Sequence, residues 1–98
     1  MPIFTMVIDR RAVLAFFACT LAEAGTFSTK WTLHQELHLI LADGMPLCPP
    51  DAIVSVRAAS EDEAKSWRHH FERALAAGEI SADEHAFAAF LVPVTFPT

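Results

Sequence analysis

The chain has 98 residues, of which 53% are hydrophobic and 19% charged, and its formal net charge is −5. This length suits one domain with one hydrophobic core, and this composition excludes intrinsic disorder. The seven Lys and Arg residues are scattered, which excludes the concentrated basic surface that nucleic-acid binding requires. The longest apolar run is well short of the ~20 residues that cross a membrane. We therefore expect a single domain over residues 1–98, with neither nucleic acid nor membrane as a partner.

Two cysteines, Cys19 and Cys48, stand far apart without a CxxC motif. Isolated thiols are typical of a reduced, cytosolic protein, so we expect a cytoplasmic location and no disulfide framework. Cys48 lies in a proline-rich loop, where a thiol could be reactive, but no cationic neighbour in the sequence would lower its pKa, which favours an inert thiol. The apolar share is high for a small domain, so we expect spare apolar surface that is buried in a homodimer.

The N-terminal quarter predicts a strand followed by a helix. Pro2–Ile8 is short, apolar and partly β-branched, which is typical of a strand. The apolar residues that follow recur at helical spacing, which predicts a helix over roughly Arg10–Ala24, with Asp9 as its cap and Gly25 at its end. A secretory signal is an alternative for this segment, because two arginines precede an apolar run that ends in Ala-Glu-Ala.

The next segment, Trp31–Leu41, alternates without a break. The more apolar side carries Trp31, Leu33, Gln35, Leu37, Leu39 and Leu41. The more polar side carries Thr32, His34, Glu36, His38 and Ile40. A period of two predicts a strand with one buried face. A helix is the alternative, because Leu33, Leu37 and Ile40 also fit a 3.6-residue spacing, but the unbroken alternation favours the strand.

Local signals define the following elements. Asp43-Gly44 predicts a turn, and a stretch with three prolines then predicts an extended loop. Ala52–Ala58 predicts the third strand. Ser60 and Glu63 have the spacing of a capping box, which predicts that a helix begins there.

Ala88–Phe96 predicts the last strand, and Pro93 favours an edge position for it. The expected order is therefore β-α-β-β-α-β. Two split βαβ units that share one antiparallel sheet form a ferredoxin-like plait, with both helices on one face. We therefore expect an α+β fold of this class.

The functional prediction follows from that fold. The polar side of Trp31–Leu41 would line the open face of the sheet, with His34, Glu36 and His38 as candidate catalytic residues. We expect a pocket there for a small-molecule ligand, in which one histidine acts as a general acid or base beside Glu36. The alternative is a non-catalytic interaction or regulatory module. No motif identifies a cofactor.

Metal binding by these residues is not expected from a strand. His34 and His38 would stand ~13 Å apart along it, whereas bonds from zinc to its ligands are only ~2 Å long. If the segment were helical, the two histidines would be at i and i+4 and could chelate one ion.

The N-terminus resembles one known family. Met-Pro-Ile at the head of the first strand, followed by Arg10 and Arg11, is similar to the start of the tautomerase superfamily. The resemblance covers residues 1–11. It implies that Pro2 would be the catalytic base after removal of Met1, and that Arg10 or Arg11 would bind a substrate carboxylate.

Overall fold

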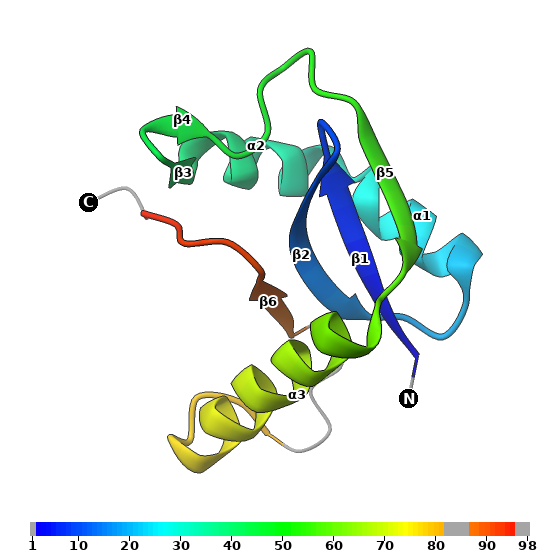
Figure 1. Ribbon diagram of the computed structural model, residues 1–98, viewed down its shortest axis with the longest axis vertical. Helices are drawn as coiled ribbons and strands as arrows, with labels where there is room; N and C mark the ends of the chain where they lie inside the picture. The colour runs from blue at the N-terminus through cyan, green and yellow to red at the C-terminus, as the bar shows by residue number, and fades with distance from the viewer. Residues whose placement is uncertain (1, 82–86, 96–98) are drawn as a thin grey trace.

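The computed structural model describes residues 2–81 and 87–95 (Figure 1). Its elements are, in chain order, β1 (Ile3–Ile8), β2 (Arg11–Phe17), α1 (Leu21–Ser28), α2 (Trp31–Leu39), β3 (Leu41–Ala42), β4 (Met45–Pro46), β5 (Val54–Ala58), α3 (Glu61–Ala76) and β6 (Ala88–Phe90). The main sheet has the strand order β5-β1-β2-β6, and every pair in it is antiparallel. The predicted α+β class with an antiparallel sheet is therefore confirmed.

The chain reverses direction immediately after β1. Asp9 and Arg10 both have positive φ angles, of 50° and 69°, as in the type I′ turns that join two-residue hairpins. Ile8 consequently pairs with Arg11. The predicted helix over Arg10–Ala24 is therefore wrong. Most of β2 is buried, so its apolar residues run on without the alternation that distinguishes a half-exposed strand from a helix.

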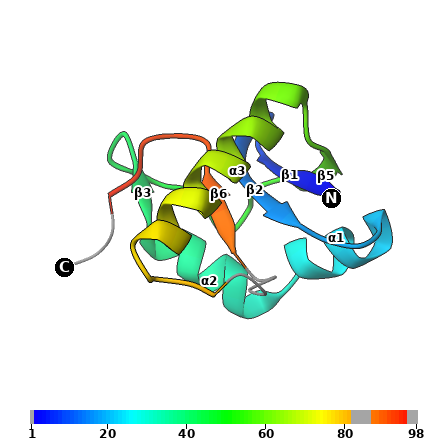
Figure 2. The same ribbon diagram turned by 90° about the horizontal axis from the view of Figure 1, so that it is seen from below.

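Alternate residues of the central strands enter two hydrophobic clusters. Phe4 and Met6 belong to the first cluster, which includes residues of α1 and α2. Ile3 and Ala15 belong to the second cluster, with Trp67 of α3. Because successive strand residues point to opposite faces, the two clusters lie on opposite faces of the sheet. Figure 2 shows this arrangement, with the strands between α3 and the pair α1 and α2.

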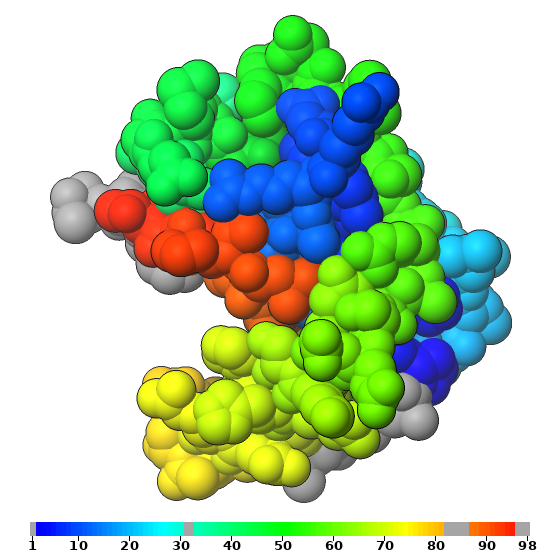
Figure 3. Space-filling view, viewed as in Figure 1, coloured from blue at the N-terminus to red at the C-terminus, as the bar shows by residue number. Residues whose placement is uncertain are grey.

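The finer expectation of a ferredoxin-like plait is not confirmed. A hairpin replaces the first βαβ crossover, and two short helices follow it. The helices also lie on both faces of the sheet instead of one. The far half of α3 extends beyond the sheet, and a hollow separates it from the C-terminal segment on the face shown in Figure 3.

The segment with unbroken alternation is a helix, and the predicted strand over Trp31–Leu41 is wrong. Leu33 and Leu37 lie four residues apart, which is the spacing of one helix side, and both pack in the first hydrophobic cluster. Leu39 would share the buried side of a strand with Leu37, yet it is 60% exposed. The alternation therefore does not mark a buried face.

The elements with strong local signals are confirmed. β1 and β5 fall within their predicted ranges, and Ser60 begins α3 with a complete capping box. Asp43 and Gly44, with φ angles of 55° and 80°, form the turn of the β3–β4 hairpin.

The predicted last strand is shorter than expected. Of its described residues, 88–95, the first three form β6, which pairs with β2 at the sheet edge, and Thr95 forms an isolated bridge with Leu41. Phe96 lies outside the described residues.

The carboxylate of Glu63 connects α3 to β1 and β5. Its Oε1 accepts hydrogen bonds from Arg57 Nη1 at 2.7 Å, from the Ser60 amide at 2.8 Å and from the Thr5 hydroxyl at 2.9 Å, while Arg57 Nη2 donates to Oε2 at 2.9 Å. The hydrogen bonds from Arg57, together with those from Ser60 and Thr5, lower the pKa of Glu63 to about 2. These donors stabilise the ionised form, so the contribution to folding requires the charge.

Replacement of Glu63 should have a pH-dependent cost. The folded-state pKa of about 2 lies below the ordinary glutamate value of 4.5, so this stability is present above pH 4.5 and is lost as the pH falls towards 2. We expect Glu63→Gln to lower the free energy of unfolding by roughly 1–3 kcal/mol at pH 7. Urea unfolding at stepped pH measures this difference, with Glu72→Gln on the exposed side of α3 as the control. A difference that does not change with pH would contradict the assignment.

The conformation of the turn between β1 and β2 leads to a second prediction. Arg10→Gly removes the steric cost of a left-handed residue and should raise the free energy of unfolding by ~0.5–1 kcal/mol. Arg11→Gly, one residue later within β2, should lower it. Thermal and urea unfolding of the two variants test this, and equal destabilisation by both would argue against the turn.

Candidate functional site

A groove of about 670 Å³ lies between α2 and the proline-rich segment that precedes β5. Its lining residues come from these two stretches and are His34, Gln35, Glu36, His38, Leu39, Cys48, Pro49, Pro50 and Ala52. The three candidate catalytic residues predicted from the sequence, His34, Glu36 and His38, are among them. The groove is therefore beside α2, and not on an open face of the sheet as the sequence predicted.

Both walls of the groove are held by the rest of the fold. Leu37 anchors α2 in the first hydrophobic cluster. The amide of Leu47 donates to the Ile40 carbonyl at 2.8 Å, which fixes the start of the proline-rich segment against the end of α2. At the other end, Ile53 and Asp9 exchange two hydrogen bonds of 2.9 Å, one of them to the Asp9 carboxylate. The groove is thus largely preformed, as ligand sites usually are.

His34 is held in one orientation by the backbone of α1. Its Nε2 lies 2.5 Å from the carbonyl oxygen of Ser28. A carbonyl oxygen can only accept, so Nε2 carries the proton and Nδ1 of the neutral ring keeps its lone pair. This hydrogen bond fixes both the tautomer and the ring plane, and it leaves Nδ1 available as a base or a ligand.

The helix sets which candidate side chains are neighbours. His34 and His38 lie one turn apart on the same side of α2, as residues i and i+4. Glu36 lies two residues from each histidine, or about 200° around the helix. All three line the groove, but helical neighbours are three or four residues apart, so the expected pairing of Glu36 with an adjacent histidine does not arise from these positions.

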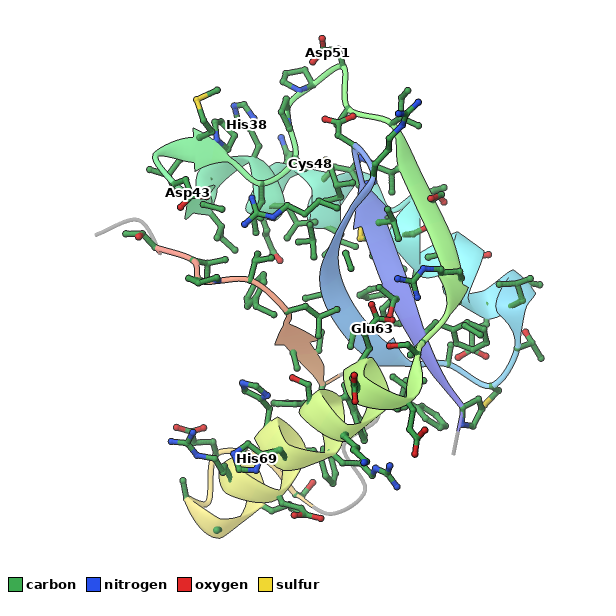
Figure 4. The ribbon with its side chains drawn as sticks, viewed as in Figure 1. His38, Asp43, Cys48, Asp51, Glu63 and His69 are labelled. Atoms are coloured by element: carbon green, nitrogen blue, oxygen red, sulfur yellow. The ribbon has the colours of Figure 1, made fainter. Side chains whose placement is uncertain are left out.

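Cys48 is a groove residue that the sequence did not assign to the site. It is only 4% exposed. Burial and the nearby negative charge of Asp9 raise the pKa of its thiol, so the thiol stays protonated, in agreement with the inert role expected from the sequence. Figure 4 shows Cys48 and His38 at the same end of the molecule.

The residues of the alternative, tautomerase-like site lie far apart within one copy of the chain. Pro2 is exposed at the start of β1, whereas Arg10 and Arg11 follow its end. A strand of this length separates them by roughly 20 Å. Arg11 is also paired with Asp43, at 3.7 Å between Nη2 and Oδ2. The tautomerase resemblance implies that Pro2 and an arginine lie close together. Within one chain they do not.

Comparisons with models of known protein families, with curated proteins and with solved structures found no match. Within residues 2–81 and 87–95, no group of three or more His, Cys, Asp or Glu side chains is placed to hold one metal ion. No helix in the described part of the chain has the length and apolar character needed to cross a membrane.

The two thiols should react at different rates. Cys19 is exposed and Cys48 is buried, and neither is in a disulfide. At pH 8 we expect an aromatic disulfide reagent to modify one thiol of the folded protein rapidly and the second at least ~10-fold more slowly, since the thiolate is the reactive form. The Cys19→Ser variant should retain only the slow phase. A fast phase in that variant would show that Cys48 is accessible.

Proposed function

We propose that this chain is a small-molecule-binding domain whose ligand occupies the groove between α2 and the proline-rich segment before β5. The observation that carries the proposal is the volume of about 670 Å³, which falls within the range of roughly 300–1,000 Å³ that is typical of ligand sites.

The lining of the groove supports a ligand with an apolar body and a few polar atoms. Leu39 and the two prolines provide apolar surface, and His34 and His38 provide nitrogen atoms at one wall. This combination of a mainly apolar wall with few orienting polar groups is the usual composition of small-molecule sites.

An enzymatic role for the same groove is a more specific version of this proposal. The hydrogen bond from His34 to the Ser28 carbonyl supports it, because general bases are commonly fixed by such a second bond. In this version Nδ1 of His34 removes or delivers a proton on a bound substrate, and His38 lies one turn away.

A second candidate function, self-association or docking to another protein, rests on a different observation. Three large apolar side chains between residues 39 and 53 are well exposed: Leu39 at 60%, Met45 at 65% and Ile53 at 77%. A homodimer that buries these side chains would account for their exposure. Sedimentation of the wild type and of Ile53→Glu separates the two functions, because only a dimer that buries these side chains would dissociate in the variant.

Blocking the groove tests the small-molecule proposal. Gln35 lines the groove and is exposed on α2, so Gln35→Trp should fill part of the space without disturbing the core. Glu72→Trp, at an exposed position of α3, is the matched control. In a fragment screen by ligand-observed NMR, we expect a set of fragments to bind the wild type and the control, and to bind Gln35→Trp at least ~10-fold more weakly. Fragments that bind all three proteins equally would contradict the location of the site.

A further inference from the structure

The helical conformation of α2 reverses the geometric argument against a metal ion at His34 and His38. In a strand these residues would stand ~13 Å apart, but in a helix the Cβ atoms of residues i and i+4 are only ~5–6 Å apart. Both side chains line the same groove. The same spacing on a helix supplies two of the ligands in helical zinc motifs.

The hydrogen bond of His34 has the form that histidine ligands commonly show. A ligating imidazole usually donates its second N–H to a carboxylate or a backbone carbonyl, which fixes the tautomer and directs the other nitrogen to the metal. Nε2 of His34 donates in this way to the Ser28 carbonyl at 2.5 Å. Its Nδ1 is therefore the nitrogen that would bind an ion.

We propose that His34 and His38 form a two-histidine site for a divalent transition-metal ion, with the remaining coordination positions open to the groove. Imidazole nitrogen suits Zn²⁺, Ni²⁺ and above all Cu²⁺. The site goes beyond the proposed function but uses the same groove, so a bound ion would give that groove open positions for the donor atoms of an organic ligand.

Other groups around the groove do not complete a protein-only site. Glu36 lies about 200° around the helix from each histidine, and the buried thiol of Cys48 stays protonated. This is consistent with the finding that no cluster of three ligating side chains exists among the described residues. Water or a ligand must therefore fill the remaining positions.

A pair of histidines on α3 provides an internal control. His69 and His70 are adjacent in sequence, and their ring centroids lie 6.0 Å apart with the rings nearly perpendicular. Nδ1 of His70 is 2.7 Å from the Ser66 carbonyl. Figure 4 shows His69 on α3, far from His38. This pair lacks the i and i+4 spacing, and its replacement shows whether an ion binds at α3 instead of at α2.

The experiment is calorimetric titration of the untagged, chelator-treated protein with Cu²⁺ and with Zn²⁺. We expect one ion per chain, and a loss of affinity of at least ~10-fold in His38→Ala and in His34→Ala. The double variant His69→Gln/His70→Gln should bind as the wild type does. His38 is exposed, so His38→Ala is expected to fold even if His34→Ala does not, and circular dichroism checks both.

Electron paramagnetic resonance of the Cu²⁺ complex identifies the ligands directly. We expect hyperfine splitting from two imidazole nitrogens in the wild type and from one in His38→Ala. Absence of binding, or equal affinity of the wild type and His38→Ala, would overturn the proposal. No organic ligand is present in these titrations, so their outcome is independent of the fragment screen that tests the proposed function.

Discussion

The structure depends on the burial of its two central strands on both faces. Thr5 and Met6 are neighbours in β1 that point to opposite faces, and each is 0% exposed. In β2, Leu14 and Ala15 are 2% and 0% exposed. A sheet buried in this way needs a cover on each face, so α3 lies against one and α1 with α2 against the other. Because α2 serves as a cover, its outer side is free to form a wall of the groove.

Burial on both faces also accounts for the composition. A chain that is 53% hydrophobic would leave much apolar surface exposed if one face of its sheet were open. Two clusters accommodate most of these residues instead, and the large apolar residues left well exposed among those described are Leu21, Leu39, Met45 and Ile53. The high apolar share is thus a consequence of the three-layer arrangement, and does not in itself indicate an oligomer.

Sequence reasoning succeeded where a signal was local and failed where tertiary packing decided. The capping box at Ser60 and the Asp43-Gly44 turn act within a few residues, and both are confirmed. The sequence wrongly predicts a helix over β2, because burial on both faces removes the alternation that indicates a strand. The start of α1 was recognisable, since Thr20 caps the amide of Glu23, a spacing that resembles a capping box. The candidate residues of α2 do line the groove, but the proline-rich wall opposite them required the fold.

The groove and the two-histidine site both require that residues 31–39 form a helix packed beside the proline-rich segment. Carbon chemical shifts of these residues, combined with nuclear Overhauser contacts to that segment, test this most directly. We predict helical shifts throughout, and contacts between Ile40 at the end of α2 and Leu47 at the start of the proline-rich segment, whose backbone groups form a hydrogen bond of 2.8 Å. Extended shifts, with cross-strand contacts in their place, would contradict the claim and remove both the groove and the two-histidine site.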